Sequence, residues 1–76
     1  MNLETLRLMR DTKLSCFSMV EIRKTNPQGG KLRTPFGLCT ICQVQEKPEG
    51  YQVVFLVTNK QLSKFIKRVE KEQKHD

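Results

Sequence analysis

Tryptophan is absent from this chain, and tyrosine and histidine each occur only once among its 76 residues. The lone His75 lies next to the chain end, where it cannot be held against a nucleophile to act as its base. Glu46 and Glu49 flank a predicted turn, and we interpret them as solvated surface residues rather than a catalytic acid pair. No glycine loop that could cradle a phosphate precedes a predicted helix. We therefore expect a protein that is not an enzyme and uses no cofactor.

Long apolar runs are also missing. No stretch approaches the roughly 18 apolar residues that a membrane span needs. The first residues, MNLETLRLMR, are charged and amphipathic, and they lack the apolar segment of a signal peptide. We expect a protein that is not secreted, that has no membrane partner and that stays in the cytoplasm, or in the nucleus of a eukaryotic cell, with reduced thiols.

Cysteine is scarce too, but two of the three cysteines form a C-x-x-C pair, Cys39 and Cys42. A structural zinc site needs four ligands, and only Cys16 and His75 remain to complete one. Side chains three residues apart on a strand point to opposite faces, so an extended pair cannot chelate one ion. We therefore predict no metal site within the chain. A site shared between two chains, each supplying Cys39 and Cys42, stays open.

The residues between these cysteines favour the extended form. Thr40 and Ile41 are both β-branched, which is typical of a strand. We predict that the cysteines are small, mostly buried strand residues. On such a strand Cys42 would share a face with Leu38 and Val44, while Cys39 would share the other face with Ile41.

The apolar residues are grouped, which predicts one small α+β domain over residues 1–76. Asn2 is placed to cap a first helix, and Pro48 with Gly50 predicts a tight turn. Thr58 with Gln61 forms the pattern of a capping box at the start of a second helix. The expected elements are a helix over 3–11, strands over 14–24, 38–45 and 51–57, a flexible basic loop over 25–37, a helix from 58 to about 71 and a frayed tail over 72–76.

These elements give the order α-β-β-β-α, a three-stranded antiparallel sheet with helix packing on one face. The unbroken VVFLV within 51–57 predicts a central strand buried on both faces. Double-stranded RNA-binding domains share this order of elements. They also carry a glycine- and lysine-containing stretch at the start of the second helix, where this chain reads TNKQLSK, so the likeness is confined to element order.

Charge is the strongest functional signal. The chain has 14 basic and 8 acidic residues, a net charge of +6 and a pI of about 9.6. In the predicted last helix the apolar positions 62, 65, 66 and 69 lie on one face. The opposite face gathers bases without an acid at its centre, and it contains Lys60, Lys64, Lys67, Arg68, Lys71 and Lys74.

A second basic group surrounds the predicted loop, and no acid occurs between positions 22 and 45. It comprises Arg23, Lys24, Lys31 and Arg33, with Gly29 and Gly30 between them. A glycine-rich basic loop can follow a phosphate backbone. The helix face and the loop together predict a non-enzymatic nucleic-acid-binding domain that contacts phosphates, with a duplex favoured because aromatic residues for stacking are few. Phe36, in the loop, is the aromatic residue that could stack on a base.

The same basic residues allow a second function from another class. A small cytoplasmic protein of this kind, like some viral or mobile-element proteins, can inhibit or modulate a larger protein by docking on its acidic surface. Uneven strand alternation would leave an apolar edge exposed, which favours a protein partner or a homodimer. Truncation of an apolar contact such as Leu32 or Phe36 would then weaken binding more than charge reversal.

Overall fold

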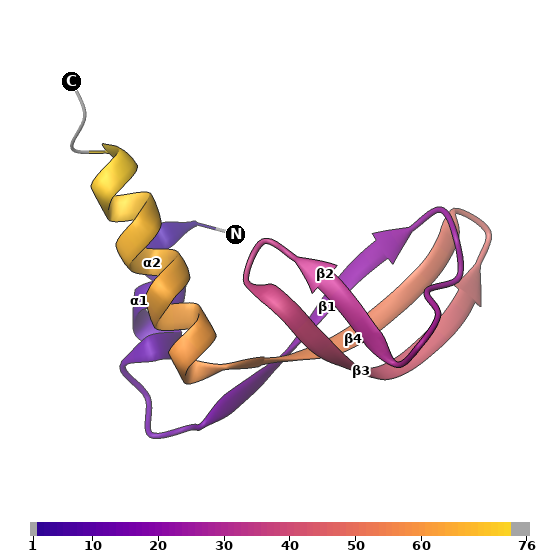
Figure 1. Cartoon of the computed structure of the whole chain (residues 1–76), viewed down its shortest axis with the longest axis horizontal. Helices are drawn as coiled ribbons and strands as arrows, with labels where there is room; N and C mark the ends of the chain where they lie inside the picture. The colour runs from indigo at the N-terminus through magenta and orange to yellow at the C-terminus, as the bar shows by residue number, and fades with distance from the viewer. Residues whose placement is uncertain (1, 74–76) are drawn as a thin grey trace.

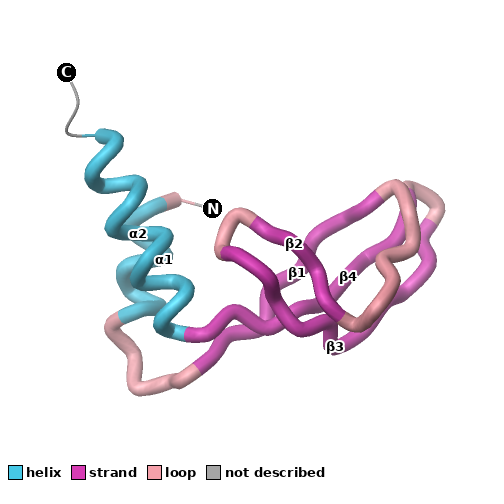
Figure 2. The backbone as a smooth tube through the Cα atoms, viewed as in Figure 1, coloured by secondary structure: helices cyan, strands magenta, loops and turns pink. Residues whose placement is uncertain are grey.

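The computed structural model describes residues 2–73 and has the order α-β-β-β-β-α (Figure 1). Both helices lie together at one end of the antiparallel sheet, and the sheet extends away from them (Figure 2). The elements are α1 (Leu3–Arg10), β1 (Cys16–Arg23), β2 (Lys31–Thr34), β3 (Gly37–Lys47), β4 (Gly50–Thr58) and α2 (Asn59–Gln73). The last helix is therefore longer than predicted, because residues 72 and 73 belong to it. Lys74 and His75 lie outside the described residues.

The prediction of three strands is wrong, because the segment expected to be a flexible loop contains the fourth strand. β2 pairs with the start of β3, from Lys31 opposite Thr40 to Thr34 opposite Gly37. Leu32 and Thr34 are buried while Lys31 and Arg33 are exposed, so this short strand alternates as a half-buried strand should. The sequence did not predict this strand, because glycines precede it and a proline follows it. The shared element order with double-stranded RNA-binding domains is lost with this correction.

The strand order is β1-β4-β3-β2, with every pair antiparallel. β4 is central, as its apolar run predicts, but it is not buried on both faces. Val53, Phe55 and Val57 are buried, whereas Val54 and Leu56 on the other face are only half-buried. The segment between β1 and β2 does not close a hairpin. It carries the chain from one edge of the sheet to the opposite edge.

One face of the sheet supplies the core. β1 contributes Phe17 and Met19, and the adjacent Val20 faces the other way: Met19 is 7% exposed and Val20 58%. Leu62 and Ile66 of α2, both fully buried, close this core from the helix side. Leu6 of α1 joins them. The helices thus pack against this face at the end of the sheet where they lie, and the opposite face of the sheet stays uncovered.

The start of α2 is fixed by the predicted capping box. The Gln61 N–H donates to Thr58 Oγ1 at 3.1 Å, and the Thr58 N–H donates to Gln61 Oε1 at 3.0 Å. Gln61 Nε2 also donates to the Leu38 carbonyl at 3.0 Å. This one side chain therefore ties the first turn of α2 to the start of β3. Asn2 caps α1 as predicted, since its Oδ1 accepts from the Thr5 N–H at 2.8 Å.

A β-bulge changes the faces that the cysteine pair was expected to share. Ile41 pairs with Phe55, but Gln43 pairs with Val54, so Cys42 is an extra residue in β3. The extra residue shifts the alternation, and Val44 therefore opposes Val53 on the core face. The prediction that Val44 shares a face with Leu38 is wrong for this reason.

Candidate functional site

The exposed face of α2 carries a continuous stripe of bases. At about 100° per residue along a helix, the five positions of this stripe fall within an arc of roughly 100° around the axis, and the stripe is about 16 Å long. Every side chain in it is exposed, and none forms an ion pair with another residue of the described chain. We call this the α2 basic stripe. It consists of Lys60, Lys64, Lys67, Arg68 and Lys71.

This arrangement opposes the stability of the helix that bears it. Lys64 has like charges three or four residues away at Lys60, Lys67 and Arg68, and such pairs each destabilise a helix by a few tenths of a kcal/mol. The first turn of α2 has no acidic residue and contains Lys60, although the helix dipole favours negative charge there. The like charges of the stripe therefore do not stabilise α2.

The turn between β2 and β3, at the end of the sheet near the helices, packs onto α2 beside the stripe. The Phe36 ring, in the turn between β2 and β3, lies on the Phe65 ring with centroids 4.7 Å apart. Arg68 extends over Phe65, its guanidinium carbon 5.4 Å from the ring centroid, and donates from Nη2 to the Pro35 carbonyl at 3.0 Å. These two contacts hold the guanidinium of Arg68 in place, unlike that of a free surface arginine.

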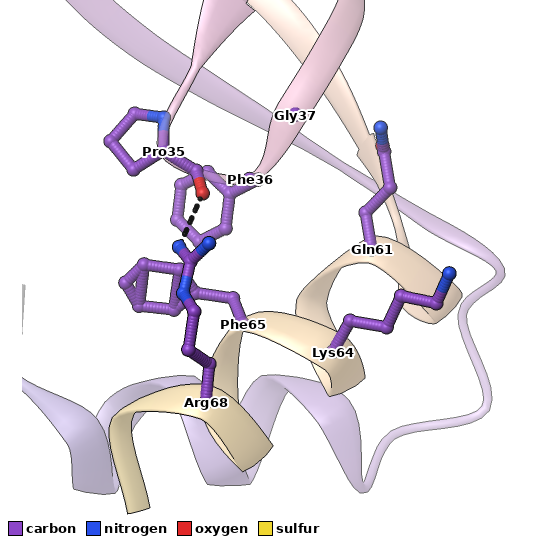
Figure 3. A pocket seen from close by; sticks show the side chains of 7 residues that line it. All are labelled: Pro35, Phe36, Gly37, Gln61, Lys64, Phe65 and Arg68. Atoms are coloured by element: carbon purple, nitrogen blue, oxygen red, sulfur yellow. Dashed lines mark hydrogen bonds between the residues drawn. The ribbon is translucent and has the colours of Figure 1, made fainter. Parts of the chain in front are cut away.

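This packing forms a shallow pocket of about 270 Å³ between the turn and the helix (Figure 3). Its only charged lining residues are Lys64 and Arg68, and Gln61 and Gly37 complete its polar rim. Figure 3 shows Arg68 rising from α2 to the Pro35 carbonyl, on the turn that faces it. A pocket with two cations and no acid suits an anionic group such as a phosphate.

The structure does not join the second predicted basic group to the α2 basic stripe. The connection after β1 lies at the end of the sheet far from the helices, and exposed Lys24 follows β1 there (Figure 1). Arg23 is half-buried and its guanidinium already has partners within the chain, since it pairs with Glu21 at 3.0 Å and donates to the Arg33 carbonyl at 2.7 Å. Lys31 is exposed and donates to Thr40 Oγ1 at 3.0 Å. Arg33 is exposed on β2.

The two apolar residues considered for contacts are needed by the fold. Leu32 is buried in the core, and the Phe36 ring is half-buried against Phe65. The Phe36 ring is therefore not a free stacking platform, because Phe65 packs against it. Sequence reasoning missed the turn that contains it, although Thr34-Pro35-Phe36-Gly37 has proline and glycine at the same positions as the predicted turn at Lys47–Gly50.

The three thiols have different surroundings. Cys39 is 2% exposed, with its Sγ 3.4 Å from Thr34 Oγ1, while Cys16 and Cys42 are exposed. The prediction of mostly buried cysteines is therefore correct only for Cys39. Within residues 2–73 no three histidine, cysteine or acidic side chains come together as metal ligands. His75, the remaining nitrogen ligand, lies outside these residues.

Neither of the two described helices has the length and apolar character to cross a membrane. Comparison of the chain with protein-family models, curated proteins and solved structures finds no match. The function must therefore be argued from the α2 basic stripe and its surroundings.

Proposed function

We propose that the protein binds nucleic acid through the phosphate backbone, with the α2 basic stripe as the main contact. The observation that carries this is the row of unpaired, exposed bases that α2 keeps against its own electrostatic preference. Backbone contacts of this kind give affinity without reading a base sequence. The pocket beside Lys64 and Arg68 supplies a place for one phosphate.

A duplex suits the stripe better than a single strand. A helix with a row of bases can enter the major groove of B-DNA, which is about 12 Å wide, or follow phosphates across a groove of duplex RNA. Single-strand binding relies on exposed aromatic rings, and Phe36 and Phe65 cover each other. The loop bases at Lys24 and Lys31 are secondary contacts in this proposal, because they lie outside α2, directly after β1 and at the start of β2.

Fluorescence anisotropy with labelled duplex DNA, duplex RNA and single strands tests the proposal. Two double variants with the same change in net charge are compared: K64E/K67E on the stripe and K24E/K31E at the loop. We expect the stripe variant to lose at least about tenfold in affinity for the preferred duplex, because two phosphate contacts become repulsions. The loop variant should lose much less. Equal losses from both variants would mean that only net charge matters, and would contradict the proposal.

The alternative, docking on an acidic surface of a larger protein, uses the same side chains. The anisotropy experiment distinguishes this alternative from nucleic-acid binding, because here nucleic acids of every form would bind weakly and without preference. Charge on the stripe would then serve to steer the protein toward its partner. Weak binding to every polyanion would therefore favour this alternative.

A further inference from the structure

A second surface, whose lining contains no residue of the α2 basic stripe, lies along the free edge of β1. A groove of about 490 Å³ runs between β1 and the turn that joins β2 to β3. Its lining is mostly apolar and includes Met9, Met19, Phe36 and Phe55, together with Ser18 and Val20 of β1. We propose that this groove binds an extended peptide segment of a partner protein, which adds a strand to β1.

The backbone of β1 supplies unpaired hydrogen-bonding groups to this groove. β1 pairs only with β4, and the Asn59 N–H donates to the Ser15 carbonyl at 2.8 Å at the start of this ladder. Backbone groups in an antiparallel pair alternate between the partner and the outside. Counting from Ser15, the N–H and C=O groups of Ser18 and Val20 point away from β4, and these are two residues that line the groove. An added strand would find its donors and acceptors there.

The residues that line the groove indicate which peptide side chain it would accept. Met9 is a flexible, partly buried apolar side chain that can adapt to a partner, and Phe36 offers aromatic surface, while the buried Met19 and Phe55 lie beneath them. One large apolar side chain of the added strand would fill this space. Of the usual devices that protect a free edge from pairing, β1 has neither a proline nor an interior lysine, and its one interior charge, Glu21, is paired with Arg23.

The rim favours acidic residues on either side of that apolar side chain. Arg23 crosses from the end of β1 to the Arg33 carbonyl, and Arg68 reaches the Pro35 carbonyl on the opposite wall. Glu21, the one charged residue of the lining, is paired with Arg23, so these two charges offset each other, and Arg68 is the rim charge that no acid within residues 2–73 offsets. A second copy of this chain would bring another β1, which ends in Arg23 and Lys24, to the same basic rim. We therefore assign the groove to an acidic peptide and not to self-association.

The probe is a panel of nine-residue peptides with alternating valine and threonine, two glutamates at each end and phenylalanine, leucine, methionine or serine in the centre. Backbone amide shifts of the protein are followed by NMR during titration. We expect the three apolar peptides to bind with micromolar to submillimolar affinity, and the serine peptide about tenfold more weakly. The shifts should concentrate on Ser18–Ile22 and Phe36. Shifts confined to α2, or no binding by any apolar peptide, would overturn the assignment.

A pair of variants at Val20 tests the edge hydrogen bonds. V20P deletes an outward N–H while leaving the ladder to β4 intact, and V20T keeps the N–H as a matched control. We expect V20P to weaken the best peptide about tenfold and V20T to leave it unchanged. If V20P fails to fold, N-methylation of alternate peptide amides tests the same bonds. Binding that tolerates N-methylation would overturn strand addition, and a dimer of the peptide-free protein with its β1 amides protected from exchange would assign the edge to a second copy.

Discussion

Phe36 and Phe65 lie against each other with their ring centroids 4.7 Å apart and their planes tilted by 40°, which joins the β2–β3 turn to α2. Tilted ring pairs of this kind add about 0.5–1.5 kcal/mol to the energy of burial alone. This contact positions the turn beside the α2 basic stripe and forms one wall of the pocket at Lys64 and Arg68. It also forms part of the wall of the β1 groove, which shares Phe36.

Replacing Phe36 with alanine should lower the free energy of unfolding by about 2 kcal/mol, because a half-buried ring and its pairing with Phe65 are both lost. Leu38→Ala is the matched control, since Leu38 is 59% exposed on the uncovered face of the sheet. It should change stability by less than about 0.5 kcal/mol. Urea unfolding followed by circular dichroism measures both. Equal effects from the two variants would show that the ring contact does not hold the turn.

Gly50→Ala should be much more disruptive than Gly29→Ala, although both glycines have positive φ angles. A Cβ at Gly50 would lie 2.5 Å from the Arg23 carbonyl oxygen, whereas a Cβ at Gly29 would meet nothing within 4 Å. Both variants acquire backbone strain, but only the first also separates β1 from β4 at this end. We expect a difference of at least about 1 kcal/mol in the free energy of unfolding. A smaller cost at Gly50 would contradict this close approach.

Lys64→Glu should stabilise the fold while it weakens duplex binding. The substitution turns three repulsive helix neighbours, Lys60, Lys67 and Arg68, into attractive ones. At low salt we expect about 1 kcal/mol, or a rise of about 4–8 °C in Tm, and most of it should disappear at 1 M salt. Lys24→Glu, which changes net charge equally outside any helix, should leave Tm nearly unchanged. A lower Tm for Lys64→Glu would show that the stripe serves the fold itself.

Two of the three thiols should react with a thiol reagent such as dithionitrobenzoate in the native protein. Cys16 and Cys42 are exposed, whereas Cys39 is buried beside Thr34 and should react only after unfolding. Cys42→Ser should be nearly neutral, and Cys39→Ser should destabilise because a serine hydroxyl costs more to bury than a thiol, even with Thr34 Oγ1 close by. Rapid reaction of all three thiols would place Cys39 outside the core.

Local signals predicted the parts of the fold that local chemistry determines. The capping box at Thr58 and Gln61 located the start of α2, and the apolar run within 51–57 identified the central strand. β2 was not predicted, because an alternation of only four residues between glycines and a proline is too short to be distinguished from a loop. The bulge at Cys42 depends on the register with β4, which no local pattern specifies.

The candidate site likewise has one part that local sequence predicts and another that depends on tertiary packing. The α2 basic stripe follows from helical periodicity, so its residues could be named from the sequence. Its pocket could not, because Phe36 meets Phe65 and Pro35 meets Arg68 only through the tertiary packing of the turn on the helix. The same holds for the β1 groove, whose walls come from α1, β1, β4 and the turn.

The most direct test of the central claim is the salt dependence of duplex binding. The affinity of the unmodified protein for a labelled duplex is measured over a series of salt concentrations. If the five bases of the α2 basic stripe all contact phosphates, log K should fall against log salt with a slope of about −4.5 on B-DNA, and the K64E/K67E variant should reduce that slope by about 2. A slope near zero, or the same slope in the variant, would contradict phosphate binding by the stripe.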